Sequence, residues 1–478
     1  MEYESVIGLE VHAELCTKTK IYCGCSTNFH AEPNTNCCPV CTGMPGTLPV
    51  LNREVVNFGI RAALATNCTV SHYSMMDRKN YFYPDLPKAY QISQFYMPLC
   101  RNGYVEIETA DGGRKNIRIK QIHIEEDAGK LIHDEDGMYS KVDYNRCGIP
   151  LIEIVSEPDM SSAEEAKEFF DTLKTILMYI NVSDCKMQEG SMRCDVNVSV
   201  KPKGQKQPGV RTEIKNMNSL SAAVKAIEYE IKRQTQILQG GGKISRETLR
   251  WDDAAGVTLS LRSKETNKDY RYFPEPDLVP IIIDDAWIDS IRAGLPQLPK
   301  EKMQRYMHEY GLSQYDAKTV TASKTMSDFL DGVIDNAIDA KTAVNWLMGD
   351  VQSYMNKNHT EPENIPFTPK DLAKLIRLID TGEINSAMGK KVLICMFEEK
   401  KTPETIVKEK GMIQISNTDE LAKMADKVIG ENMQSVYDYK NGKDKALGFL
   451  MGQVMRLSGG RANPQTVSKI IKGKLDKM

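Results

Sequence analysis

Long hydrophobic runs are missing from this chain of 478 residues. No segment approaches the roughly 18 apolar residues that a membrane-spanning helix needs. The opening stretch MEYESVIGLEVHAELCTKTK also lacks the basic and apolar regions of a secretory signal. We therefore expect a cytoplasmic protein with no membrane partner, in which clustered cysteines bind a metal or react rather than form disulfides.

Glycine-rich phosphate-binding motifs are missing as well. Neither GxxxxGK(S/T) nor GxGxxG occurs in the sequence. This excludes the two common loops that hold nucleotide phosphates through backbone amides. If the chain binds a nucleotide, it must do so through a metal ion and side chains.

The length of the chain favours several domains. The periodicity of its apolar residues also changes along the sequence. Residues 1–293 show period-two alternation between turn signals, which predicts a sheet-rich domain with inserted helices. Residues 294–404 and 405–478 show helical patterns instead. We therefore expect an α+β chain with a sheet domain, a helical domain and a helical tail domain.

Two helices inside the sheet domain have recognisable ends. One is predicted to begin at Ser161, with Glu164 completing a capping box. The other is predicted to begin at Ser219 or Ser221 and to end at the glycines 240–242.

Charge is concentrated in the tail. The net charge of the chain is −3, but residues 436–478 hold nine Lys and Arg against three Asp and Glu. Such a segment suits contact with nucleic-acid phosphates, although many charge runs are only solvated surfaces. The candidate phosphate contacts are Lys443, Lys445, Arg456, Arg461 and Lys469.

The segment 23–41, CGCSTNFHAEPNTNCCPVC, contains five of the twelve cysteines. Cys23 with Cys25 and Cys38 with Cys41 form two close pairs, and two short turns of this kind can place four thiolates around a tetrahedral zinc ion. We predict structural zinc in this cysteine knuckle. The alternatives are reduced cysteines packed in a loop, or a nucleophilic thiol, for which nearby His30 alone is a poor constellation.

Acidic and basic side chains share faces of the predicted strands. In VIGLEVHAEL, Glu10 and His12 point away from the apolar face, and in IRIKQIHIEED the same alternation places His123 beside Glu125. Two further strands, RCDVNVSV and RTEIKN, place on one face Arg193, Asp195, Asn197 and Ser199, and Arg211, Glu213 and Lys215.

Several acids on one sheet face suit a hard cation such as magnesium, which prefers oxygen ligands and often accompanies nucleotide phosphates. Arg193, Arg211 and Lys215 are then candidates for neutralising phosphate. The alternative is a half-solvated antiparallel sheet, which shows the same alternation without any site.

Longer segments of the sequence resemble the B-subunit family of the bacterial aspartyl/glutamyl-tRNA(Asn/Gln) amidotransferases. The resemblance covers essentially the whole chain and rests on these segments, in family order: VIGLEVHAEL, EPNT with CPVCTGMPGTLPVLN, DRKNYFYPDLPKAYQISQ, HIEEDAGK, PLIEIVSEPD, EGSMRCDVNVSV, EIKNMNS, DYRYFPEPDLVP, NWLMGD, EINSAMGKKV and GKDKALGFLMGQVMRLSGGRANPQ. It implies a cradle-shaped first domain similar to the glutamine synthetase and guanido kinase catalytic fold, then a helical domain and a tail similar to the YqeY proteins.

The resemblance also implies a function. The family's enzyme has three subunits and converts Glu-tRNA(Gln) to Gln-tRNA(Gln), and often Asp-tRNA(Asn) to Asn-tRNA(Asn). Its B subunit uses ATP and Mg²⁺ to phosphorylate the side-chain carboxylate, and ammonia then displaces the phosphate. This chain has no amidase signature, so the implied partners are a glutaminase A subunit, a small C subunit and misacylated tRNA.

Site residues follow from the same resemblance. It assigns the magnesium site to Glu10, His12, Glu125, Asp195 and Glu213. We assign the chemistry to Glu125, Glu126 and Lys79, with Glu126 as the alternate to Glu125. The nucleotide contacts are Arg193, Arg211, Lys215, Tyr83 and Lys88. The cysteine motif varies within the family, so its zinc is implied to be structural, and its loss to loosen a loop near the active site.

The segment DRKNYFYPDLPKAYQISQ suits contact with the terminal adenosine of tRNA, because it combines positively charged and aromatic side chains. These are Arg78, Lys79, Lys88, Tyr81, Phe82, Tyr83 and Tyr90. The alternative is a proline-braced aromatic loop packed on the core. Arg271 in DYRYFPEPD is a further candidate contact.

Two other functions remain open. The chain could be a non-catalytic tRNA-binding scaffold whose acids only solvate a sheet. It could also be a metal hydrolase that uses His12 and His123, although an oxygen-rich ligand set is closer to the preference of magnesium or manganese than of catalytic zinc.

Overall fold

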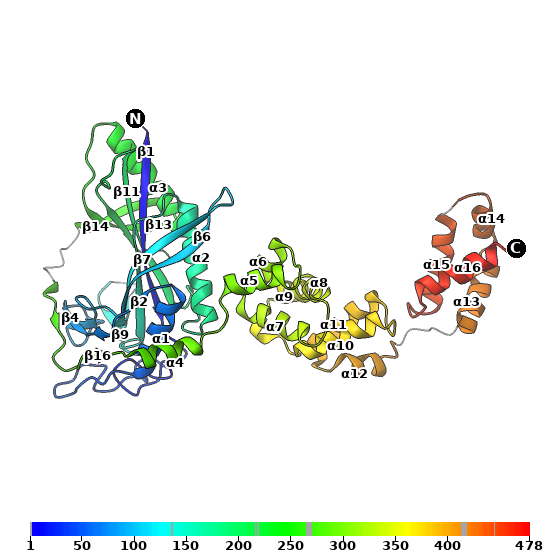
Figure 1. Cartoon of the computed structure of the whole chain (residues 1–478), viewed down its shortest axis with the longest axis horizontal. Helices are drawn as coiled ribbons and strands as arrows, with labels where there is room; N and C mark the ends of the chain where they lie inside the picture. The colour runs from blue at the N-terminus through cyan, green and yellow to red at the C-terminus, as the bar shows by residue number, and fades with distance from the viewer. Residues whose placement is uncertain are drawn as a thin grey trace. The chain divides into compact units, whose positions relative to one another are not determined.

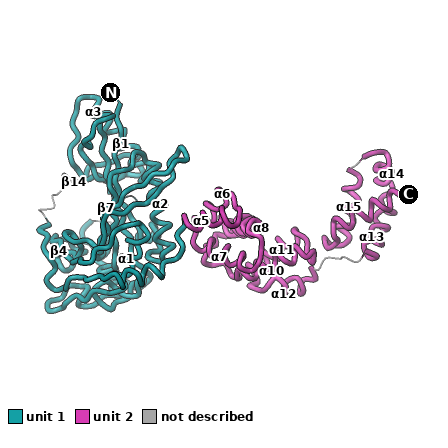
Figure 2. Tube along the Cα trace, in the orientation of Figure 1, with its two compact units in different colours: residues 1–299 teal, residues 300–478 magenta. Residues whose placement is uncertain are grey.

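The computed structural model describes residues 2–134, 137–215, 217, 219–263, 270–412, 418–443 and 445–478. The chain divides into two compact units, residues 1–299 and 300–478 (Figure 2). The domain limits predicted at 293 and 404 stay predictions. Of the segments that carry the resemblance, Asn216, Asn218, Asp269 and Asp444 lie outside the described residues.

A nine-stranded sheet forms the frame of the first unit, in the order β14-β13-β12-β11-β1-β10-β7-β6-β2 (Figure 1). Its neighbouring strands are antiparallel except for the parallel pair β12 and β13. The strands are β1 (Tyr3–Glu14), β2 (Thr69–Val70), β6 (Cys100–Glu108), β7 (Arg114–Glu126), β10 (Pro150–Ser156), β11 (Met192–Pro202), β12 (Thr212–Lys215), β13 (Glu247–Asp252) and β14 (Val257–Ser263). The predicted large N-terminal sheet is confirmed.

Smaller sheets border this frame. One contains β15 (Phe273–Pro274), β4 (Asp77–Asn80) and β5 (Tyr90–Ser93), and two pairs are formed by β3 (Tyr73–Ser74) with β16 (Ile281–Ile282) and by β8 (Lys130–His133) with β9 (Ser140–Asp143). β5 is held at the end of β7, because the Gln91 side chain donates to the Glu126 carbonyl at 2.8 Å.

The core of the first unit lies between one face of the sheet and three helices, α1 (Arg53–Ala65), α2 (Ala163–Tyr179) and α3 (Leu220–Gln239). Leu9 and Val11 of β1 and Phe169 and Leu173 of α2 are at most 2% exposed. Residues of opposite parity, such as Glu10 and His12, are less buried. The strand alternation read from the sequence is therefore confirmed on β1, and it leaves the polar side chains on the face that these helices do not cover. A fourth helix, α4 (Asp285–Ala293), follows β16.

Helix α2 begins one residue later than predicted. Ser162, not Ser161, is the N-cap, and its hydroxyl accepts from the Glu165 amide at 3.2 Å. Ser161 donates to the Glu165 carboxylate from its backbone amide at 2.7 Å. The sequence offers two serines followed at the same spacing by Glu164 and Glu165, so it fits two alignments, and burial of Ala163 and Ala166 selects the second.

Helix α3 supplies a test of cap assignment. Ser219 is its N-cap and accepts from the Ala222 amide at 3.1 Å, whereas Ser221 lies exposed in the first turn. We expect Ser219→Ala to lower the free energy of unfolding by about 1 kcal/mol. The matched Ser221→Ala should have no cost, because alanine is the better helix former. Urea unfolding followed by circular dichroism measures both, and equal destabilisation would contradict the cap assignment.

The second unit is helical in its described residues. Its helices are α5 (Pro299–His308), α6 (Gln314–Thr321), α7 (Lys324–Ile334), α8 (Ala340–Asn345), α9 (Gln352–Asn358), α10 (Pro369–Asp380), α11 (Ser386–Glu399), α12 (Pro403–Glu409), α13 (Thr418–Glu431), α14 (Met433–Lys440), α15 (Lys445–Leu457) and α16 (Pro464–Leu475), with a π-helical turn at Trp346–Val351 and a 3-10 turn at Pro362–Asn364. Two separate hydrophobic cores stabilise it, one between Tyr306 and Val407 and one between Leu421 and Leu475. Among the helices described, none has the length and apolar character to cross a membrane.

Candidate functional site

Three acids from neighbouring strands converge on the polar face of the sheet. We call Glu10, Asp195 and Glu213 the acidic trio, since each places a carboxylate oxygen within 4.8 Å of the others. Glu10 of β1 lies directly opposite Asp195 of β11, and the Asn197 side chain donates to Glu10 at 2.9 Å. Lys215 lies 2.7 Å from Asp195 and 3.3 Å from Glu213. Three of the five predicted magnesium ligands are thus brought together.

The acidic trio holds more negative charge than its surroundings neutralise. Burial raises the pKa of Glu10, and the negative charges of Glu153 and Glu213 raise it further. A divalent cation would relieve both effects, and carboxylate oxygens are the ligands that magnesium prefers. The donor set therefore fits a hard cation.

A second cluster lies beside the first. We call His12, Glu125 and Glu153 the histidine trio, whose ligand atoms also lie within 4.8 Å of one another. His12 Nε2 is 3.5 Å from Glu125 and 3.6 Å from Glu153. Ser93 donates to Glu125 at 3.4 Å, and His123 Nε2 lies 2.7 Å from Glu153. His123 therefore orients a carboxylate of the trio rather than joining it, which leaves the hydrolase hypothesis without its second histidine ligand.

Opposite charges in and beside the histidine trio shift the pKa values of its members toward their ionised forms. Burial alone would lower the pKa of His12, but the charge and hydrogen bond of Glu153 and the charge of Glu125 outweigh burial and raise it to about 9. Although burial also opposes its ionisation, Glu153 has a pKa well below its usual range because of the charges of His123 and His12. Glu10 and His12 are two residues apart on one strand, about 7 Å. The sheet therefore presents two adjacent clusters of possible metal ligands, and an ion held by the second would have to take the place of the His12 proton.

Glu153 is a site residue that the sequence analysis missed. It lies in PLIEIVSEPD, a segment used there only for its resemblance. The sequence did carry a signal, because Glu153 is the only polar residue in the run LIEIV. Its neighbours Ile152 and Ile154 are fully buried. A lone acid within an apolar strand points to the polar face, where β10 pairs it with His12.

Glu126 and Lys88 lie apart from both trios. Because side chains alternate along β7, Glu126 leaves the face that carries Glu125. The Lys88 ammonium lies 2.5 and 2.6 Å from the two Glu126 oxygens, and the Ile92 amide donates to the same carboxylate at 2.9 Å. The structure brings this predicted catalytic residue and this predicted nucleotide contact to each other, not to the magnesium ligands.

The remaining predicted phosphate contacts differ in their surroundings. Arg193 lies opposite His12 and is paired with Asp127 at 2.7 Å. Lys215 forms ion pairs with Asp195 and Glu213 of the acidic trio. Arg211 is exposed directly before β12, where a ligand can reach it.

The aromatic segment after β4 combines packed and accessible side chains. Arg78 is held by Glu275 at 2.6 Å and lies over the Tyr90 ring at 4.2 Å, so it braces the fold. Phe82 and Tyr83 are 75% and 57% exposed and can stack on a ligand. Packing on the fold is therefore observed for Arg78, whereas contact of Phe82 and Tyr83 with a ligand stays a prediction.

Lys79 joins a cluster of tyrosines. Its ammonium lies 5.1 Å from the centre of the Tyr270 ring, and Tyr270 packs edge-on against Tyr272. Burial raises the pKa of Tyr272, and the charges of Glu125 and Glu153 raise it further. Arg271, the residue of this segment predicted to contact tRNA, is exposed, and its carbonyl accepts from Asn80 at 2.8 Å.

The four predicted zinc ligands do come together. Cys23, Cys25, Cys38 and Cys41, here the cysteine cluster, have sulfur atoms within 4.8 Å of one another. The Cys38 and Cys41 sulfurs are 3.9 Å apart, close to the roughly 3.8 Å edge of a tetrahedron with Zn–S bonds of about 2.3 Å. The hydrogen bond between Cys23 and Cys41 lowers the pKa of Cys41 to about 4 and raises that of Cys23, so the two sulfurs share a proton that a bound metal ion would replace. The cluster can therefore hold a metal ion. Cys37 makes a separate contact with the Asn34 carbonyl at 3.2 Å.

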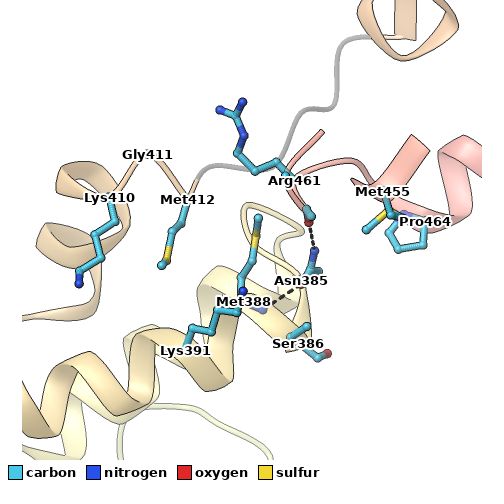
Figure 3. A pocket seen from close by; sticks show the side chains of 13 residues that line it. Asn385, Ser386, Met388, Lys391, Lys410, Gly411, Met412, Met455, Arg461 and Pro464 are labelled. Carbon is cyan, nitrogen blue, oxygen red and sulfur yellow. Dashed lines mark hydrogen bonds between the residues drawn. The ribbon is translucent and has the colours of Figure 1, made fainter. Parts of the chain in front are cut away.

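The predicted phosphate contacts of the tail are all exposed. Lys443 is paired with Asp438 at 3.0 Å, and Lys445 and Lys469 lie on α15 and α16. Arg461 lines a pocket of about 710 Å³ together with Lys391 and Lys410 (Figure 3).

At the edge of this pocket, the Asn385 side chain connects the start of α11 to the loop between α15 and α16. Asn385 accepts from the Met388 amide at 2.9 Å and donates to the Gly460 carbonyl at 3.0 Å, as Figure 3 shows. The Arg461 guanidinium points away from Asn385 in this view, and its Nε donates to the Ser458 carbonyl at 3.2 Å.

Comparison with known proteins places this site in a family. The family described as the GatB/GatE catalytic domain matches residues 5–289, and the GatB domain matches residues 328–475. The B subunit of the aspartyl/glutamyl-tRNA(Asn/Gln) amidotransferase of Thermoanaerobacter sp. (strain X514) is 58% identical over 478 residues, which cover 100% of both chains. The protein of the same name from Caldicellulosiruptor saccharolyticus is 56% identical, and the one numbered 1 from Clostridium acetobutylicum is 53% identical, each with 100% of both chains covered. With similarity along its whole length and both domains matched, the chain belongs to the B-subunit family of the aspartyl/glutamyl-tRNA(Asn/Gln) amidotransferases.

Proposed function

We propose that this chain is the component of a tRNA-dependent amidotransferase that activates the side-chain carboxylate of Glu-tRNA(Gln), Asp-tRNA(Asn) or both. It transfers the γ-phosphoryl group of ATP to that carboxylate with the help of Mg²⁺. Ammonia then attacks the acyl phosphate, an amide bond forms and phosphate leaves. The overall reaction is that of a carbon–nitrogen ligase with glutamine as the nitrogen donor.

The two adjacent trios carry this proposal. A carboxylate is a poor acyl donor until one of its oxygens becomes a phosphate leaving group, and phosphoryl transfer depends mainly on positioning and charge neutralisation. The acidic trio and the histidine trio would hold Mg²⁺, which offsets phosphate charge and orients the reacting oxygens. The exposed Arg211, two residues before Glu213, and Lys79 are proposed to offset the negative charge of phosphate. Acids on the uncovered face of a mainly antiparallel sheet also support the proposed likeness to the glutamine synthetase and guanido kinase fold.

The remaining parts of the reaction require partners. We propose a glutaminase A subunit as the source of ammonia and a small C subunit as the third member of the complex. The exposed Phe82 and Tyr83 are the proposed stacking surface for the terminal adenosine of tRNA. The cysteine cluster is proposed to hold structural zinc, since its tetrathiolate geometry leaves no ligand position open for chemistry.

Phosphate release by the reconstituted three-component complex tests the proposal. We expect release that requires both ATP and a misacylated tRNA. If the complex assembles and binds tRNA but releases no phosphate, the chain is a tRNA-holding scaffold and not the kinase.

The tail gives a separate prediction about tRNA binding. We expect Lys445→Gln with Lys469→Gln to weaken tRNA binding and to reduce the slope of log K against log salt by about one for each lost phosphate contact. The matched control is Lys423→Gln with Lys427→Gln, two lysines of α13. Filter binding at several salt concentrations measures both pairs. Equal slopes for the two double variants would show that the effect is only one of net charge.

A further inference from the structure

Lys20 is a buried lysine that plays no part in either trio. It has no exposed surface, although lysine is almost never fully buried unless it is paired. Its ammonium lies 3.5 Å from the Cys41 sulfur and 3.2 Å from the Tyr144 carbonyl. Glu126, a carboxylate that lines the same pocket, is already bound by Lys88 at 2.5 and 2.6 Å. The charge of Lys20 is therefore directed at the cysteine cluster.

The backbone fixes Lys20 in this place. Its amide donates to the Cys25 carbonyl at 2.9 Å, and the next amide, of Ile21, donates to the Gly148 carbonyl at 3.0 Å. Gly148 has a positive φ of 80°, and a Cβ there would lie 3.5 Å from the Cys41 Cβ and 3.6 Å from the Lys20 Cδ. The lysine side chain thus lies packed between the cysteine cluster and a closely approaching backbone.

The contact between Lys20 and Cys41 would offset negative charge on a metal-bound cysteine cluster. Four thiolates around Zn²⁺ carry a net charge of about −2, which is costly beside a protein core. One ammonium donating to a metal-bound sulfur halves that charge and draws electron density from the thiolate. Partners of this kind outside the ligand shell commonly change metal affinity by about 10- to 100-fold.

We propose that Lys20 is a positioning residue of the cysteine cluster, where its ammonium donates to the Cys41 thiolate and retains the bound metal ion. This inference rests on the proposed zinc site. It adds a fifth residue to a site otherwise defined by its four sulfur ligands.

The test compares metal retention in the full-length chain carrying Lys20→Met with the native chain. Zinc content is measured by atomic emission, and zinc release by the absorbance of the chelator 4-(2-pyridylazo)resorcinol. We expect Lys20→Met to release zinc at least about tenfold faster than the native chain. The matched control is Lys18→Met, two residues away and exposed, which should release zinc at the native rate.

The outcomes separate the two proposals. A native chain purified without zinc or another metal overturns the metal assignment itself. A native chain that holds zinc but releases it at the same rate as Lys20→Met overturns the role of Lys20. If Lys20→Met does not fold, Lys20→Arg and Lys20→Gln decide the question, because only arginine keeps the charge. Slower release from Lys20→Arg than from Lys20→Gln supports the proposal, and equal release overturns it.

Discussion

Replacing Glu125 with glutamine is expected to abolish tRNA-dependent phosphate release and amide formation by the assembled complex. Glu125 is buried, contributes to the histidine trio and lies 3.5 Å from His12. Glutamine keeps the shape but removes the negative charge that a magnesium ion requires, so we expect a loss of at least about a hundredfold in rate. Phosphate release with charged tRNA measures the effect directly.

Two controls distinguish this loss from misassembly. Glutaminase activity of the partner should survive in the Glu125→Gln complex, since no residue of this chain is proposed to cleave glutamine. Glu164→Gln, an exposed glutamate in the first turn of α2, should behave as the native protein. Unchanged amide formation by the Glu125→Gln complex would falsify the assignment of the histidine trio.

Replacing Cys41 with serine is expected to remove the metal ion from the cysteine cluster and to destabilise the first unit. Cys41 is buried, and its sulfur contacts Cys38 and Lys20. A serine hydroxyl is a poor substitute for a thiolate, and structural zinc contributes directly to folding. We expect metal content to fall below about a tenth of the native value and the melting temperature to fall by about 5 °C.

The adjacent thiol provides the control. Cys37 lies next to Cys38, but its sulfur contacts the Asn34 carbonyl instead of the cluster. Cys37→Ser should therefore keep the native metal content and melting temperature. Loss of metal in both variants, or in neither, would contradict the four-cysteine assignment. Emission spectroscopy and a thermal melt of the full chain supply both readouts.

Local patterns predicted much of the first unit because they depend on near neighbours. The alternation in VIGLEVHAEL matches the burial along β1, and Ser219 caps α3 as one of the two serines proposed. The start of α2 was wrong by one residue, since Ser161 and Ser162 are each followed by a glutamate at the capping distance. Only packing of the helix against the sheet distinguishes them.

The site features that could not be predicted from the sequence depend on how strands distant in the chain pair with one another. Which residue of β1 lies opposite Glu153 depends on strand pairing, so Glu153 had no assigned role until β1 and β10 were aligned. Tyr272 comes from a segment far along the chain, and its ring stacks on Phe95 with the ring centres 4.3 Å apart. The adjacent glutamates at 125 and 126 point to opposite faces, and only the pairing of Glu126 with Lys88 shows which one is neutralised by a lysine.

By itself, the sequence determined the family, the faces of the main strands and the four cysteines of a metal-binding cluster. The family follows from the resemblance of long segments, whereas the strand faces and the four cysteines follow from two-residue alternation and short spacing, which the chain encodes locally. The tertiary structure decided which acids form each trio and that Lys20 contacts the cysteine cluster, because these neighbours are set by strand register and packing between distant segments. Charges interact strongly over only a few ångströms in a folded protein, so their partners are known only when the fold brings them together.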